Sequence, residues 1–435
     1  MNISQKPCSD VLSLFAHRLP KRNTCGQQKT EAVAWLEHKG LPDKRVEQWR
    51  YTDLRALGRV PYKTALRTYN PYHAEKLLHT LPQWGEILAN LPRFVVVNGY
   101  FDPVLSQIPQ TFTLTTCPFE NVSGNGGKGE DLKGIQQPFM ALNTALAEEE
   151  IFLHVQEGVK VGQVLMVSLT LGDEQPVSLH PRYTLKLDKG AHLSLLSIYA
   201  GDGIYCHNPV EQIEIAEHAT LKHLTLFQES AQASVLKMVQ ARVAGRGVYE
   251  SFILTLGGLL TRHDINVVLA QTGAVAKVNG VQYLSDEQTG DITSVICHEA
   301  SECISRQTIR NVLSDHARGV FQGKILVKRG AQKTDGCQMS QALLLSEHAE
   351  VNVKPELEIY ADDVRCSHGA TIGALDEEQL FYLRSRGIAE HEARHMLIEA
   401  FLSDSLSLLE EEGVVRALCH AVLTRSLDLR EEQQS

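Results

Sequence analysis

Long apolar runs and an excess of positive charge are both missing from this chain of 435 residues. No apolar run approaches the roughly 20 residues that span a membrane. The first ten residues also lack the apolar core of a signal peptide. Lysine and arginine total 42 against 52 aspartate and glutamate, and the formal net charge is −10. This balance gives no basic footprint for nucleic acid. We therefore expect neither a membrane nor a nucleic acid as partner.

Paired cysteines are absent as well. The nine cysteines are scattered, odd in number, and form no Cys-x-x-Cys motif. A secreted disulfide framework and a zinc ribbon are therefore disfavoured. The expected compartment is the reducing cytoplasm.

Several catalytic signatures are also absent. The sequence has no Gly-x-Ser-x-Gly elbow and no dinucleotide-binding glycine fingerprint. The glycine-rich run Gly124–Gly129 lacks the Walker spacing, and no Ser or Thr follows its Lys128. We interpret this run as a loop.

Strand-like runs follow one another from about residue 151 to residue 373, with almost no helical signal. A turn built on a small residue after a polar one precedes several of them, at Gly190, His218, Gly247 and Gly273, roughly every 27–28 residues. It returns less regularly near Asp315 and His348. A repeat of this length predicts stacked coils. The expected fold is mainly β, with a parallel β-helix (solenoid) core at 151–373.

Helices are expected at both ends of the solenoid, because its terminal coils need caps. Residues 1–150 predict a mostly helical region with short strands, including a strand at Phe94–Val97 that ends at the turn pair Asn98-Gly99. Residues 374–435 predict a helical region that begins with a capping-box-like start at Asp376. Its second helix should begin at Glu390 with an apolar stripe of Ala393, Met396, Leu397, Ala400 and Phe401, and a third should cover Leu406–Leu423.

The densest polar chemistry lies in the last predicted strand. Cys366 and His368 are two positions apart, so a strand places both side chains on one face. A thiolate beside an imidazole suits iron or zinc. They make only half a site, because tetrahedral centres need about four donors. The missing donors must come from elsewhere in this chain or from another chain. The alternative is that both side chains simply pack.

Two other patterns predict different functions. His391-Glu392-Ala393-Arg394-His395 matches His-Glu-x-x-His, the zinc-peptidase helix with Glu392 as general base, although no third ligand is evident. A β-helix carbohydrate-active enzyme would need paired carboxylates on one outer face. Asp286, Glu287 and Asp291 are the candidates, and they resemble loop residues around Gly290.

Three segments resemble one family. The run Tyr-Ala-Asp-Asp-Val-Arg-Cys-Ser-His-Gly-Ala-Thr at 360–371 is similar to the C-terminal signature of the SufB/SufD family, scaffold components of the SUF iron–sulfur cluster assembly machinery. Phe-Tyr-Leu-Arg-Ser-Arg-Gly-Ile at 381–388 continues that signature, and Glu-Gln-Trp-Arg-Tyr-Thr at 47–52 resembles the N-terminal run of the same family. The SufB-type sister carries Glu after the matching His and a Cys about one coil upstream. Here Gly369 follows His368, and Cys337 is the nearest thiol, so the SufD branch is the closer match.

This resemblance implies a right-handed parallel β-helix and a non-catalytic scaffold subunit. It implies a SufB-type partner and a SufC-type ATPase that grips the C-terminal helical region. It further implies that His368, and less directly Cys366, hold a nascent iron–sulfur cluster shared with the partner. Family complexes can carry reduced flavin. The sequence leaves open whether the isolated chain forms a homodimer.

Overall fold

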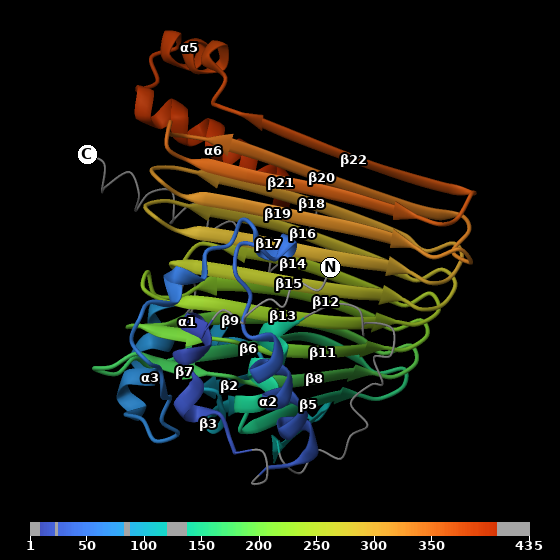
Figure 1. Ribbon diagram of the computed structural model, residues 1–435. Helices are drawn as coiled ribbons and strands as arrows, with labels where there is room; N and C mark the ends of the chain where they lie inside the picture. The colour runs from blue at the N-terminus through green and yellow to red at the C-terminus, as the bar shows by residue number, and fades with distance from the viewer. Residues whose placement is uncertain (1–8, 22–24, 82–87, 120–136, 407–435) are drawn as a thin grey trace, which may run out of the picture.

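The computed structural model describes residues 9–21, 25–81, 88–119 and 137–406. The predicted loop Gly124–Gly129 and the predicted helix Leu406–Leu423, apart from its first residue, lie outside these ranges. Two sheets, parallel except for the antiparallel pairs β2–β3 and β4–β5, form the walls of a β-solenoid, with helices at both ends of the chain (Figure 1). The predicted fold class is confirmed.

The strands alternate between the two walls because each coil contributes one strand to each sheet. Sheet A has twelve strands, nine of them in the order β21 (Glu350–Ile359), β19 (Arg318–Val327), β17 (Thr289–His298), β15 (Leu260–Leu269), β13 (Ser234–Val243), β11 (Val210–Ile215), β8 (Arg182–Leu187), β5 (Glu149–Val155) and β4 (Thr113–Pro118), with β1 (Lys63–Thr64), β7 (Val177–Leu179) and β10 (Tyr205–His207) beside them. Sheet B has ten, in the order β22 (Val364–Gly373), β20 (Thr334–Leu344), β18 (Ile304–Leu313), β16 (Val275–Leu284), β14 (Val248–Thr255), β12 (Thr220–Gln228), β9 (His192–Gly201), β6 (Lys160–Thr170), β2 (Arg93–Val97) and β3 (Tyr100–Gln107). The register between coils is continuous, so inward-facing side chains stack in columns.

In every coil from β5 to β20, one residue is left-handed where the chain passes from sheet A to sheet B. These residues form a column of positive φ: Gly158, Gly190, His218, Arg246, Gly273, Glu302 and Lys333. The predicted repeat marks this edge correctly for its first four members. Its extension to Asp315 and His348 is wrong, because those turns lead from sheet B back to sheet A at the opposite edge. Both edges turn sharply and both place a small alanine inward, at Ala317 and Ala349 on the second edge, so their sequences look alike.

Helices cover the N-terminal part of the solenoid and project from its C-terminal end (Figure 1). The N-terminal region contains α1 (Ser9–Ser13), η1 (Ala16–Arg18), α2 (Gln27–Lys39), η2 (Glu47–Trp49), η3 (Leu54–Leu57), α3 (Pro71–Thr80), η4 (Leu88–Asn90) and α4 (Pro138–Leu146). The C-terminal region contains α5 (Glu377–Ser385) and α6 (Glu390–Leu406). Asp376 caps α5 by accepting hydrogen bonds from the backbone N–H groups of Glu378 and Gln379, as the sequence predicts.

The packing face of α6 matches the predicted stripe in part, because Leu397 and Phe401 also pack against the apolar cluster of the wall. Ala393, Ile398 and Leu402 are buried, whereas Met396 is exposed. Ile398 and Leu402 pack with Leu343 of β20 in one apolar cluster. The wall of the solenoid, and not the apolar pattern alone, therefore sets the rotation of this helix.

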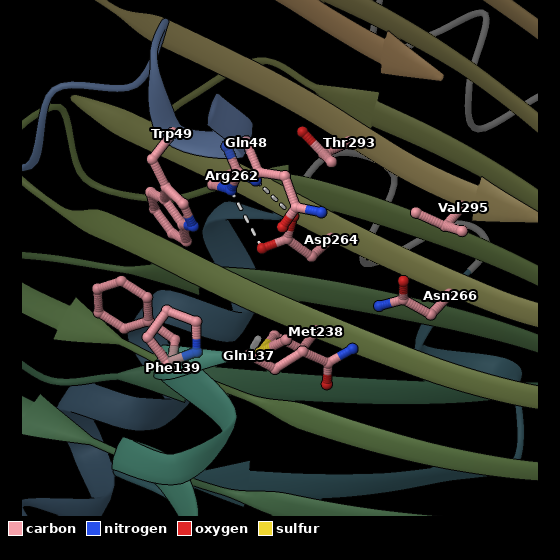
Figure 2. A pocket seen from close by; sticks show the side chains of 11 residues that line it. Gln48, Trp49, Gln137, Phe139, Met238, Arg262, Asp264, Asn266, Thr293 and Val295 are labelled. Atoms are coloured by element: carbon pink, nitrogen blue, oxygen red, sulfur yellow. Dashed lines mark hydrogen bonds and ion pairs between the residues drawn. The ribbon is translucent and has the colours of Figure 1, made fainter. Parts of the chain in front are cut away.

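A strap of residues 47–52 ties the N-terminal region to the outer face of sheet A (Figure 2). The Arg262 guanidinium lies 3.9 Å from the Trp49 ring centroid and bonds Asp264 at 2.7 Å and Asp291 at 2.5 Å. Thr52 donates a hydrogen bond to Asp291. The adjoining recess holds only about 20 Å³, about the space of one water. The strap is therefore a packing element.

The strap continues along the solenoid toward its C-terminal end. Gln322 of β19 donates to the Gln48 carbonyl at 3.0 Å, and Lys354 of β21 pairs with Glu47 at 2.6 Å. Together with Arg262 and Asp291, these contacts join four of the six strap residues to four successive strands of sheet A, from β15 to β21.

The solenoid interior carries a buried ionic cluster among its apolar columns. Lys237 Nζ lies 2.7 Å from Glu211, and the Tyr199 hydroxyl donates to the same carboxylate at 2.8 Å. His223 shares a 2.9 Å hydrogen bond with the Ser197 hydroxyl. Burial alone would raise the pKa of Glu211, but Lys237 and then His223 outweigh it and the pKa is lowered. Burial also lowers the pKa of His223 to about 4.

We expect His223 to make stability fall with acid. The native state disfavours the imidazolium, so below pH 6.5 the unfolded chain binds the extra proton and the free energy of unfolding drops. Between pH 7 and pH 4.5 this group should cost about 2.5 kcal/mol. Urea denaturation at both pH values should show a smaller pH-dependent loss for His223→Gln than for the native chain. His38→Gln, at an exposed position of α2, is the control. An unchanged pH dependence in His223→Gln would contradict the assignment.

Candidate functional site

The predicted donor pair lies on β22, the last strand of the solenoid (Figure 1). β22 pairs with β20, which places Cys366 opposite Gly336 and His368 opposite Gln338. Each of the two residues stacks on its partner in β20, and both partners, Gly336 and Gln338, are buried. The two side chains therefore share the inner face, as period two predicts, but no described residue covers that face at the open end of the stack. His368 is consequently exposed and Cys366 half-buried.

Cys366 is the more enclosed of the two donors. A Cβ on Gly336 would lie 3.5 Å from its sulfur, so the absence of a side chain there leaves room for the thiol. Cys366 packs against a small apolar cluster that includes Ile325 and Val327. Burial raises its pKa, so a metal ion or cluster must displace a proton to bind the sulfur.

The pair remains half a site. Within the part of the chain that the structure describes, no group of three or more His, Cys, Asp or Glu side chains is arranged to hold a metal ion. Cys337 does not complete it: Cys337 alternates with the buried Gly336 and Gln338 and therefore faces outward, away from Cys366. Additional donors would have to approach over the open end.

Two polar side chains beneath the pair were missed by sequence reasoning. Gln338 and Ser340 are almost completely buried on the inner face of β20, one coil below His368 and Ala370. Neither side chain makes a hydrogen bond with the described residues. The amide of Gln338 reaches toward Gly323 of β19, where a Cβ would lie only 3.1 Å from Nε2. Both residues occupy inward positions of the period-two pattern, which could have identified them from the sequence. Polar side chains such as Gln are, however, common in strands.

The peptidase motif lies on the first turns of α6. His391 and Glu392 are exposed and His395 is half-buried. The residues that the structure describes offer this pair no third ligand, and they give the peptidase hypothesis no support.

The carboxylates proposed for a carbohydrate enzyme are separated by the fold. Asp286 and Glu287 are exposed in the turn before β17. Asp291 is not a loop residue: it lies within β17, is fully buried, and is bonded to Arg262 and Thr52. The interpretation as three neighbouring loop residues is wrong for Asp291, because the strap covers the outer face of sheet A at this point.

The C-terminal helices leave an aromatic surface uncovered. Phe381 and Tyr382 on α5 are 73% and 56% exposed. Large apolar side chains this exposed are typical of interaction sites.

No described helix is long and apolar enough to cross a membrane.

Fold and geometry together define a β-solenoid protein with a cysteine and a histidine on one face of its last strand, at an open end. Residues 169–401 match the model of the SufBD core domain of SUF system FeS cluster assembly. The chain is 31% identical over 407 residues to the iron–sulfur cluster assembly protein SufD of Escherichia coli, covering 92% of each chain. It is 28% identical over 397 residues to a SufBD family protein of Synechocystis, covering 86% of each. It is 26% identical over 302 residues to SufD of Bacillus subtilis, covering 67% of this chain and 68% of that one. The chain belongs to the SufBD family of the SUF iron–sulfur cluster assembly system.

Proposed function

We propose that this chain is a non-catalytic, SufD-like subunit that supplies part of a nascent iron–sulfur cluster site. His368, with Cys366 beside it, contributes donors at the open end, and a SufB-type scaffold protein supplies the others. The observation that carries the proposal is the geometry of the pair: two cluster-type donors, on one face of the last coil, without a third among the described residues.

The two terminal strands differ in a way that supports β22 as the docking edge. β21 carries Pro355 and the charged residues Glu350, Lys354, Glu356 and Glu358, which are features that protect an edge from pairing. β22 has no proline, and Arg365 is its only charged residue. An unprotected ten-residue edge beside the donor pair suits a strand from a second chain.

The C-terminal helical region is proposed as the contact for a SufC-type ATPase. The exposed Phe381 and Tyr382 support this, because aromatic side chains are enriched in protein interfaces. Three further elements complete the proposal: a cytoplasmic location, reduced flavin in the assembled complex without a site assigned to this chain, and a homodimer of the isolated chain. These rest on family membership.

A charge placed on the open end should prevent association. Ile372 is 55% exposed on the inner face of β22, so Ile372→Lys should put an ammonium into the interface without disturbing the fold. We expect co-purification with co-expressed SufB-type and SufC-type proteins to recover at least about tenfold less SufB-type partner, since each 1.4 kcal/mol of lost binding is tenfold.

The matched control is Ile304→Lys, because Ile304 is similarly apolar and exposed but begins β18 on the side wall. This variant should retain the partner. Full retention by Ile372→Lys, or no SufB-type partner with the native chain, would contradict the proposal.

A further inference from the structure

A cationic recess lies in the N-terminal region, far along the stack from β22. It has a volume of about 540 Å³ and is bounded by η1, α2, β1 and the end of α4. A recess of this size is typical of small-molecule sites. Its basic lining residues are His17, Arg18, Lys29 and Lys63.

The lining of the recess is mainly basic, although the whole chain is acidic. The formal net charge is −10, yet Glu148 is the only acidic residue among the described residues that line the recess. Two lysines and an arginine converge there from three separate elements. A local surplus of positive charge in an acidic protein points to an anion as ligand.

Hydrogen bonds hold the Arg18 side chain of this recess in place. Its Nη1 donates to the Ser178 carbonyl of β7 at 3.1 Å and also contacts the Ser178 hydroxyl. Arg18 also lines a smaller polar cavity of about 20 Å³, together with Asn98 and His180. A half-buried guanidinium held in one orientation is suited to bind phosphate oxygens in a fixed geometry.

The two lysines lie on the rim of the recess and come from different elements. Lys29 projects from α2 with its ammonium 5.9 Å from the Phe119 ring centroid. Lys63 begins the short strand β1 and is exposed. Pro20, Ala145 and Leu146 give the rest of the wall an apolar character. This combination offers a place for a phosphate and for an apolar group attached to it.

We propose that this recess binds a phosphate group, either as a free phosphate ion or as part of a small phosphorylated molecule. Arg18 fixes the phosphate, and Lys29 and Lys63 add charge from the rim. The recess shares no lining residue with the cysteine–histidine pair.

Isothermal titration calorimetry of the full chain with pyrophosphate, ADP and adenosine tests the proposal. Pyrophosphate and ADP should bind, with affinities that fall as salt is added, and adenosine should not. ADP binding more tightly than pyrophosphate indicates a phosphorylated organic ligand, and equal affinities indicate a free phosphate ion.

The double variant Lys29→Glu/Lys63→Glu should weaken both phosphate probes at least about tenfold, because two attractive charges become repulsive. Lys39→Glu/Lys76→Glu makes the same change at exposed lysines of α2 and α3 that do not line the recess, and it should bind as the native chain does. The proposal is overturned if neither phosphate probe binds, if adenosine binds as tightly as ADP, or if the rim variant binds as tightly as the native chain.

Discussion

Arg262→Ala should lower the free energy of unfolding by about 3–5 kcal/mol, the usual cost of removing one partner from a buried ion pair. Asp291 is fully buried, and without the guanidinium its carboxylate loses its only ion-pair partner among the described residues. The substitution also removes the cation–π contact to Trp49 and the pairing with Asp264. Urea denaturation at neutral pH gives the measurement.

Two further variants test whether the loss of stability comes from the unpaired Asp291 carboxylate. Arg59→Ala, at an exposed loop position, should change the free energy of unfolding by less than about 0.5 kcal/mol. Arg262→Ala/Asp291→Asn should be less destabilised than the sum of its single variants, because the stranded charge is gone. A loss below about 1 kcal/mol in Arg262→Ala would show that the strap contributes little.

His368→Ala should reduce cluster formation on the reconstituted three-component complex at least about tenfold, because loss of a direct donor should cost no less than loss of a group that only orients a ligand. His368 is exposed on β22, so the variant should fold and associate normally. Cluster absorbance, with iron and sulfide content per complex, gives the yield.

Ser367→Ala is the matched control, because Ser367 is the neighbouring exposed residue on the opposite face of the same strand. Its yield should equal that of the native chain. Cys366→Ser should lose less than His368→Ala, since Cys366 packs against the apolar cluster that includes Ile325 and Val327. Equal cluster yield from His368→Ala and the native complex would contradict the proposed role.

Local patterns in the sequence predicted the solenoid and the placement of the donor pair. Alternation in single strands put Cys366 and His368 on one face, and the turn repeat identified one edge of the coils. These features depend on neighbours in the chain, and local sequence records them directly. The position of His368 at an open end followed from the sequence order, because β22 is the last strand before the helices.

Contacts between distant segments were beyond sequence reasoning. Asp291 looks like a turn residue until Thr52, 239 positions away, is placed against it. Likewise, the rotation of α6 depends on Leu343 in the wall beneath it. The position of Gln338 and Ser340 beneath β22 follows only from the strand register. In each case packing across coils, and not the local pattern, decides the environment.

Stacked-coil proteins ordinarily lose structure from their ends, because each coil is held only by its neighbours. The strap at 47–52 alters that behaviour. Its contacts reach from β15 to β21, so the last strand of sheet A is tethered to the N-terminal region as well as to its neighbouring strand. Amide hydrogens of β21 should then exchange together with those of β15 in one cooperative unit, and the sheet A strand of the last coil should stay ordered even before a second chain arrives.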